Sequence, residues 1–186
     1  MSKVALLVVD LVNDFTSQGG KHYYPETEKI MPNVCSLIEE LHKRGALVIY
    51  IQQITPASAG GNGIIANLSC VEGTGGELLD SRLPVTDQDE IVVKRKPSGF
   101  FETDLQDTLQ RYGVDTVALA GTKTNYCVRA TATDAMMRDY KVYVISDCVS
   151  TNTAELNQFH LEDLAKYTAK VIDSQGFLHL MDSGEI

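Results

Sequence analysis

The 186-residue sequence contains no tryptophan, only four cysteines and no apolar run long enough to cross a bilayer. Because the cysteine spacings match neither CxxC nor a zinc-binding pattern, we expect free thiols rather than a disulfide framework. The first apolar run, Val4–Val9, has no signal-peptide pattern before it. These absences predict a cytoplasmic protein that does not insert into membranes.

Basic side chains are also scarce. The chain has 16 Lys and Arg residues against 25 Asp and Glu residues, which gives a formal net charge of −9 and a pI near 4.8. Nucleic acids and anionic membranes are polyanions, so this charge balance argues against both as partners. A small-molecule substrate is compatible with it, because a binding site can be locally positive on an acidic protein.

Glycine motifs for phosphate binding are missing as well. No GxGxxG follows the first apolar run, where the sequence reads LVVDLVNDF, and no P-loop pattern occurs anywhere. Gly60, Gly61 and Gly63 lie in a long segment without the strand-to-helix context that a phosphate cradle requires. The sequence therefore predicts no cofactor.

What the chain does contain is an alternation of apolar runs and helical patterns. Six apolar runs cover residues 3–9, 46–51, 91–93, 116–120, 142–145 and 170–172. Helix-like spacing of apolar residues marks residues 30–41, 105–112, 128–136 and 156–164. Since the runs are continuous rather than alternating, we expect strands that are buried on both faces. The pattern predicts one α/β domain over residues 1–186, with a doubly wound, mainly parallel, six-stranded sheet and helices on both faces, as in Rossmann-like folds.

Residues 53–76 interrupt this alternation. They are rich in Gly, Ser, Asn and Thr, and core-like segments flank them on both sides. We interpret them as a long loop or lid rather than a linker between domains. The segment contains no pattern that identifies a substrate.

Three chemically capable side chains stand at the ends of apolar runs. Asp10 and Lys94 end two of the runs, and Cys127 follows a third run just beyond Gly121. The carboxyl ends of parallel strands meet at one edge of a sheet, so we expect these groups to converge. The lysine and a helix N-terminus would favour the thiolate, and the aspartate would carry protons.

Each of the three residues also has a purely structural interpretation. Asp10 fits a turn cap, and Cys127 fits a small buried apolar residue. Lys94 fits a solvated strand end, which its neighbours Arg95 and Lys96 make plausible. The joint spacing is more specific than any one residue, because all three lie at the same predicted edge.

Longer stretches around these residues resemble the isochorismatase-like cysteine hydrolases, in their metal-free amidohydrolase branch. The matching stretches are VALLVVDLVNDF, VVKRKPSGFFETDL and AGTKTNYCVRATATDAMMRDYKVYVISD, in this order. The resemblance implies a catalytic triad of Cys127, Asp10 and Lys94. It implies that the cysteine attacks a carbonyl carbon, that the aspartate shuttles the proton, and that the lysine supports both charges.

The resemblance also implies an oxyanion site and reveals two departures. It implies a cis peptide bond between Thr122 and Lys123, with the backbone N–H groups of Lys123 and Cys127 facing the oxyanion. The family commonly has glutamine where this chain has Val12, and a small apolar residue at the position of Lys123. The Lys123 side chain either reaches a substrate anion or points to solvent or a surface carboxylate, the second being the more usual state of a lysine.

Nicotinamidases of this family bind a divalent metal through an Asp-x-His pair after the second strand. Here that place reads YIQQITPASAG, and no histidine occurs between His42 and His160. We therefore expect no metal site. Gln52 and Gln53 occupy this position, where one of them contacts a substrate amide or both are satisfied strand-end side chains.

Aromatic and basic residues supply further candidates for substrate binding. Phe15, Phe100 and Tyr126 are candidate apolar walls, although Phe100 or its neighbour Phe101 also fits the core. The candidates for a substrate carboxylate are Arg95, Lys96 and Arg129, for which solvation is the stronger alternative, and His22 is a lesser candidate near the mouth of the site.

The leading functional hypothesis is a metal-free cysteine hydrolase that cleaves a C–N bond of a small amide or ureido (N-carbamoyl) compound through a thioester. A vinyl ether hydrolase of the isochorismatase type is the first alternative, and Cys127 weighs against it because such enzymes generally lack the cysteine. A non-catalytic small-molecule-binding member of the fold is the second. The resemblance suggests a homo-oligomer, either a dimer or a tetramer.

Overall fold

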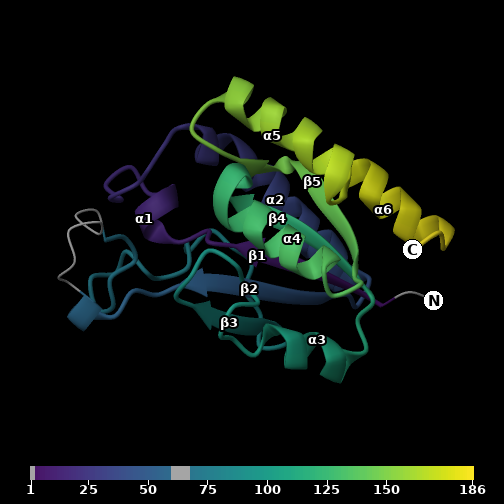
Figure 1. Ribbon diagram of the computed structural model, residues 1–186, viewed down its shortest axis with the longest axis horizontal. Helices are drawn as coiled ribbons and strands as arrows, with labels where there is room; N and C mark the ends of the chain where they lie inside the picture. Colours follow the sequence, from purple (N-terminus) through teal and green to yellow (C-terminus); the bar gives the residue numbers. More distant parts are fainter. Residues whose placement is uncertain (1–2, 60–67) are drawn as a thin grey trace.

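The computed structural model describes residues 3–59 and 68–186 and contains one six-stranded, all-parallel sheet (Figure 1). The strands are β1 (Val4–Val9), β2 (Leu47–Gln53), β3 (Glu90–Lys94), β4 (Thr116–Thr122), β5 (Lys141–Ser150) and β6 (Lys170–Ile172). Their spatial order is β3-β2-β1-β4-β5-β6. Strands β2 and β3 are added on one side of β1, and β4, β5 and β6 are added on the other, so the strand order reverses between β1 and β4. Doubly wound sheets bind ligands at this point. The predicted fold class is confirmed.

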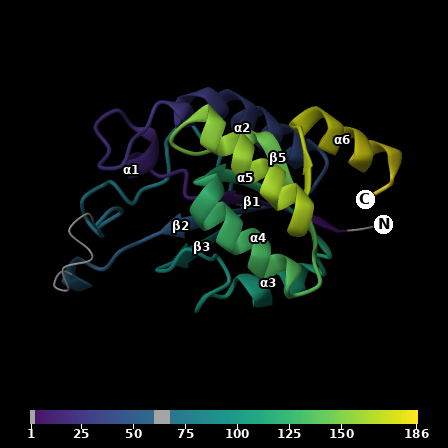
Figure 2. The same ribbon diagram turned by 45° about the horizontal axis from the view of Figure 1, so that its top comes forward.

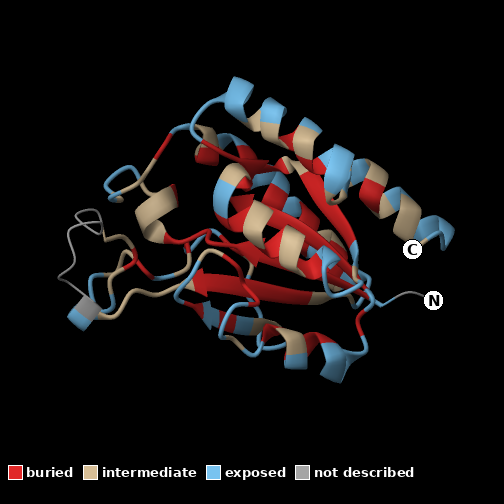
Figure 3. Cartoon of the chain, in the orientation of Figure 1, coloured by how far each residue is buried: buried red, intermediate tan, exposed pale blue. Residues whose placement is uncertain are grey.

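Helices cover both faces of the sheet (Figure 2). They are α1 (Asn13–Thr16), α2 (Glu26–Lys43), α3 (Leu105–Tyr112), α4 (Arg129–Met136), α5 (Ala154–Tyr167) and α6 (Ser174–Ser183), with a 3₁₀ turn η1 (Ala57–Ala59) and a π-helical turn η2 (Thr124–Val128). Alternate residues of β1 face opposite layers, so Leu6 and Val8 pack with α2 and α6 while Leu7 and Val9 pack with α3, α4 and α5. The two central strands, β1 and β4, are therefore buried on both faces (Figure 3).

The helix boundaries follow from local chemistry. Thr153 caps α5, where its hydroxyl accepts the backbone N–H of Leu156 at 3.2 Å. Gly113 ends α3 in the left-handed conformation, with φ of 67°. The sequence analysis did not predict the short helix α1, the terminal helix α6 or the π-helical turn η2. The first and last of these are single turns, for which apolar periodicity gives no signal.

The carboxyl ends of the strands and their following loops lie at one end of the molecule, and both termini lie at the other (Figure 1). The predicted lid falls partly on residues 60–67, which lie outside the described residues. The two described parts of this segment are tied to each other, because Thr55 and Val71 form an isolated β-bridge. No helix in the described parts of the chain has the length and apolar character needed to cross a membrane.

Gly121 permits the close approach of β4 to β1. Its φ is 111°, and a Cβ built at this position would lie 2.0 Å from the backbone oxygen of Val9. We predict that Gly121→Ala lowers the free energy of unfolding by about 3 kcal/mol, since strain and a backbone clash add. Urea unfolding measures this change. Gly45→Ala is the control, because Gly45 has φ of 67° and open space around it; an equal loss in both variants would contradict the clash.

Candidate active site

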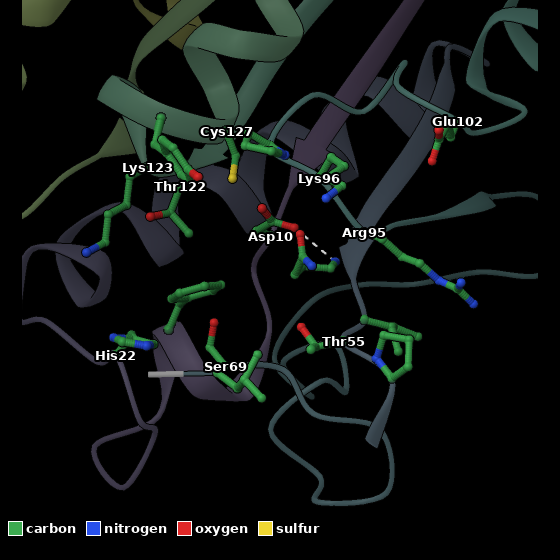
Figure 4. Close-up of a pocket in the computed structure, with 17 residues that line it drawn as sticks. Asp10, His22, Thr55, Ser69, Arg95, Lys96, Glu102, Thr122, Lys123 and Cys127 are labelled. Carbon is green, nitrogen blue, oxygen red and sulfur yellow. Dashed lines mark hydrogen bonds between the residues drawn. The ribbon is translucent and has the colours of Figure 1, made fainter. Parts of the chain in front are cut away.

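A cavity of about 810 Å³ opens at the carboxyl edge of the sheet (Figure 4). Its lining comes from the loops after β1, β2, β3 and β4. The lining residues are Asp10, Phe15, His22, Gln53, Ile54, Thr55, Pro56, Leu68, Ser69, Arg95, Lys96, Pro97, Glu102, Thr122, Lys123, Tyr126 and Cys127. The cavity therefore gathers residues that are far apart in the sequence at the point where the strand order reverses.

Asp10 reaches the cavity because β1 ends between two neighbouring strands. Val9 pairs with Ile51 of β2 and with Gly121 of β4, so the next residue emerges between them. Asp10 adopts φ of 52°, a left-handed conformation that aspartate tolerates better than most residues. Its backbone N–H donates to the oxygen of Ile51 at 2.9 Å, and its Oδ1 accepts the backbone N–H of Gln53 at 3.0 Å. These bonds fix the carboxylate, which is 1% exposed.

Lys94 is the last residue of β3, and its side chain is completely buried. Its Nζ lies 2.7 Å from Oδ2 of Asp10 and donates to Sγ of Cys127 at 3.5 Å. It also donates to Oε1 of Gln53 at 3.0 Å. One ammonium group thus contacts both other members of the expected triad, through an ion pair with Asp10 and a hydrogen bond to Cys127. A solvated strand end, the alternative for Lys94, is excluded by its burial.

Cys127 lies in the π-helical turn η2 that leads into α4. π-Helical turns are rare and often occur at functional sites. The carbonyl oxygen of Cys127 accepts the hydroxyl of Thr131 at 2.8 Å, which anchors the turn to the helix. The thiol lines the cavity with 8% of the residue exposed, so it is accessible to a ligand but shielded from bulk water.

The groups around Cys127 raise the net pKa of its thiol. Burial raises its pKa, the Asp10 carboxylate raises the pKa further, and the ammonium of Lys94 offsets only part of this. Burial alone would lower the pKa of Lys94, but Asp10 and Cys127 outweigh it and the net pKa is raised. Lys94 therefore acts in the direction that we expected, in favour of the thiolate, although the net pKa of Cys127 is raised. Because the pKa is raised, the sulfur needs a base when it attacks, and Asp10 is the carboxylate beside it.

A network of buried hydroxyl groups holds the segment between β4 and Cys127 in place. The peptide bond that joins Thr122 to Lys123 is cis. Tyr24, which is 6% exposed, shares hydrogen bonds through its hydroxyl with the hydroxyls of Thr122 and Ser150, the latter at 2.9 Å. The sequence analysis missed Tyr24 and Ser150. Neither residue stands at an expected strand end facing the site, and only the folded chain brings positions 98 residues apart into contact.

The two glutamines that end β2 point in opposite directions, as alternation along a strand requires. Gln53 lines the cavity and holds Lys94, as described above. Gln52 does not line it, because its Nε2 donates to the backbone oxygen of Glu77 at 2.7 Å. The structure therefore brings Gln53 into the site and assigns Gln52 to the loop that follows.

The aromatic candidates also divide. Phe15 and Tyr126 line the cavity, and the ring of Phe15 stacks on His22 with centroids 6.2 Å apart. Phe100 is 5% exposed and lies in the core between α3 and α4, where the guanidinium of Arg138 covers its ring at 4.8 Å. Phe100 is thus part of the core, the alternative that the sequence had left open, and not of the cavity wall.

The basic candidates differ in the same way. Arg95 and Lys96 line the cavity, whereas Arg129 does not. Arg129 joins α4 to α5 instead, since its guanidinium contacts Oδ2 of Asp163 at 2.6 Å and Nδ1 of His160 at 3.0 Å. Its predicted role with a substrate carboxylate is therefore replaced by a structural one.

Asp14 organises the outer wall of the cavity, and the sequence analysis did not assign it. Its Oδ2 accepts the backbone N–H of Cys70 at 2.5 Å, and its Oδ1 accepts that of Lys21 at 3.2 Å. These bonds hold the segment that contains Ser69 against the segment that contains His22. The stretch VALLVVDLVNDF includes Asp14, but spacing alone does not show what its carboxylate binds.

The residues after β2 do not fit the divalent metal of the nicotinamidase branch. Gln53, Ile54 and Thr55 supply an amide, an alkyl group and a hydroxyl where a carboxylate and an imidazole are needed. Within residues 3–59 and 68–186, no three His, Cys, Asp or Glu side chains lie close enough together to hold a metal ion. The donor set is therefore unsuited to that metal.

Comparisons with known proteins identify the family of this chain. The family model described as the isochorismatase domain matches residues 4–176. The isochorismatase family protein YaaI of Bacillus subtilis is 34% identical over 168 residues, which cover 87% of this chain and 89% of that protein.

Two solved structures are similar over most of the chain. An isochorismatase-like hydrolase from Alkaliphilus metalliredigens superposes with a TM-score of 0.90 at 33% identity, covering 97% of this chain and 100% of that one. N-carbamoylsarcosine amidase from Thermoplasma acidophilum superposes with a TM-score of 0.82 at 29% identity, covering 92% and 96%. With the family model spanning nearly the whole chain, this protein belongs to the isochorismatase family of hydrolases.

Proposed function

We propose that this protein is a cysteine hydrolase that cleaves the C–N bond of a small amide or ureido compound. The observation that carries the proposal is the buried ammonium of Lys94, which contacts Asp10 at 2.7 Å and Cys127 at 3.5 Å. A nucleophile, a base and a positive charge that supports both are thereby assembled at the floor of one cavity. A purely structural cysteine has no need of such neighbours.

In the first half of the reaction, Asp10 takes the thiol proton while Sγ of Cys127 attacks the carbonyl carbon. The negative charge that leaves the sulfur moves onto the carbonyl oxygen of the tetrahedral intermediate. Asp10 then delivers its proton to the nitrogen, the C–N bond breaks, and ammonia or an amine departs. The acyl group remains on the sulfur as a thioester. Lys94 keeps its proton throughout and compensates the charge that moves between carboxylate and sulfur.

In the second half, water replaces the departed nitrogen. Asp10 takes a proton from this water, whose oxygen attacks the thioester carbonyl. The C–S bond breaks, and the proton returns to the sulfur. The products are a carboxylic acid, or a carbamic acid in the case of a ureido substrate. The same carboxylate thus serves as base and acid in each half.

The tetrahedral oxyanion requires donors in fixed positions. We assign the backbone N–H groups of Lys123 and Cys127 to this role. Support comes from the anchoring of this segment, because Tyr24 holds Thr122 on one side and Thr131 holds the carbonyl of Cys127 on the other. Donors of this kind typically contribute about 3 kcal/mol each to transition-state stabilisation.

The similarity to N-carbamoylsarcosine amidase supports a ureido or simple amide substrate. The test is ammonia release from a panel of small carboxamides and N-carbamoyl amino acids, measured with and without EDTA. We expect turnover of at least one compound at a rate that EDTA does not change, because the residues after β2 do not suit a metal. Treatment with iodoacetamide should abolish that turnover, and the substrate should protect against it.

Two outcomes would contradict the proposal. Turnover that EDTA removes and zinc restores would make the enzyme metal-dependent. Hydrolysis of a vinyl ether that survives complete alkylation of Cys127 would place the protein with the ether hydrolases. Each result points to a different chemistry, so the panel separates them.

A further inference from the structure

Lys123 places a positive charge on the cavity wall, at the position directly after the last residue of β4. The residue lines the cavity and is partly buried. Its Nζ donates to Oδ1 of Asn152 at 2.6 Å and lies 4.8 Å from the centroid of the Tyr24 ring. The hydrogen bond and the cation–π contact hold the ammonium in place. An ammonium has three N–H donors, and the bond to Asn152 uses one of them.

This ammonium has no anionic partner within the protein. Among the described residues, no carboxylate oxygen lies within 4.0 Å of its Nζ. The segments outside the description, residues 1–2 and 60–67, contain no Asp or Glu. Burial lowers the pKa of Lys123. A partly desolvated cation without a counter-ion on a cavity wall is the complement of an anionic ligand.

We propose that Lys123 forms an anion subsite that binds a carboxylate of the substrate while the scissile carbonyl lies at Cys127. The inference rests on the proposed function and deepens it, since it selects amides that carry a carboxylate over neutral ones. One ammonium balances one negative charge, which matches a carboxylate. A phosphate dianion would bring a second charge into a cavity whose floor already holds the Asp10 carboxylate.

Arg95 is the competing cation, and the geometry favours Lys123. The side chains of Lys123 and Arg95 extend from Asp10 and Cys127 in opposite directions, Lys123 on the side of His22 and Arg95 on the other (Figure 4). Arg95 is also exposed, so water screens its charge. A carboxylate held by Arg95 would lie at the rim, whereas Lys123 follows directly on Thr122 beside the thiol.

The test compares two amides of equal shape. Succinamate carries a carboxylate, and 4-oxopentanamide carries a methyl ketone in its place. The ratio of their kcat/KM values, measured by ammonia release, should fall about 10-fold or more in Lys123→Met, because a charged hydrogen bond is lost for one substrate only. The ratio isolates the side chain from any effect of the backbone N–H at the same residue. Lys166→Met, which removes an exposed charge on α5 outside the cavity, should keep the parent ratio.

A binding measurement decides the matter even if neither amide is a good substrate. Succinate should bind Cys127→Ala in calorimetry, and about 10-fold or more weakly to the Cys127→Ala, Lys123→Met double variant. An unchanged substrate ratio with unchanged succinate affinity would overturn the subsite, as would a loss that appears in Arg95→Met instead. Full turnover by Cys127→Ala would overturn the proposed function, and succinate binding would still judge the subsite.

Discussion

Replacing Cys127 with alanine should lower kcat by about 10⁴-fold or more for any amide that the parent enzyme hydrolyses. The thiol supplies the atom that bonds to the carbonyl carbon in the proposed mechanism, and no other described cysteine lines the cavity. Without it, only water positioned in the cavity remains as a nucleophile. Ammonia release under substrate saturation measures the loss.

The fold should survive this substitution, because removing one sulfur from a residue at the cavity surface opens no closed void. Circular dichroism and urea unfolding check that the variant is native. Cys35→Ala is the matched control, since Cys35 lies on α2 outside the cavity, and it should retain parental turnover. Parental kcat in Cys127→Ala would refute nucleophilic catalysis by this residue.

Replacing Lys94 with methionine should lower the free energy of unfolding by about 3–5 kcal/mol, because it leaves the Asp10 carboxylate buried without its counter-charge. Both partners are essentially inaccessible, at 0% and 1% exposure of their side chains. The control is Lys43→Met, which breaks an exposed pair with Glu40 within α2 and should have a far smaller effect. Equal midpoints in urea for parent and Lys94→Met would show that the buried pair does not hold the site together.

The same variant should react more slowly with iodoacetamide at alkaline pH. The thiolate is the reactive form, and its population rises with pH towards the raised pKa of Cys127. Lys94 is the group that lowers this pKa, so its removal raises the pKa further and moves the alkylation profile to higher pH. A Cys35→Ala background removes the signal of Cys35, which lies outside the cavity and is only partly buried. A profile that moves to lower pH would contradict the assigned contact.

Much of this site was predictable because the first residues after buried strands point to one edge. Asp10, Lys94 and Cys127 each follow a continuous apolar run, and parallel strands bring such positions together. The sequence also placed a pair of glutamines at the end of the second strand. Only the structure shows that Gln53 rather than Gln52 faces the cavity. Alternation along a strand predicts that the two glutamine side chains point to opposite faces of the sheet. Which of them faces the cavity depends on where the strand ends.

The remaining features depend on contacts between distant segments. Phe100 lies in the core because α4 packs over it, which no local pattern states. The bond from Cys70 to Asp14 spans 56 residues, and the contact of Tyr24 with Thr122 spans 98. The expectation for the thiolate was incomplete for a related reason. It counted the nearby ammonium and helix end, whereas the depth of burial and the adjacent carboxylate decide the pKa.

The position of β3 in the sheet has a consequence for how activity would be lost. β3 lies at an edge and pairs with β2 alone, and its outward-facing Ile91 and Val93 are 50% and 46% exposed. Edge segments with few buried neighbours fray at lower free energy than the interior of a sheet. Fraying of five residues would withdraw the Lys94 ammonium while the four inner strands remain paired. Under mild heating or denaturant, inactivation would then precede global unfolding. Residual enzyme activity would therefore report whether β3 is still paired with β2.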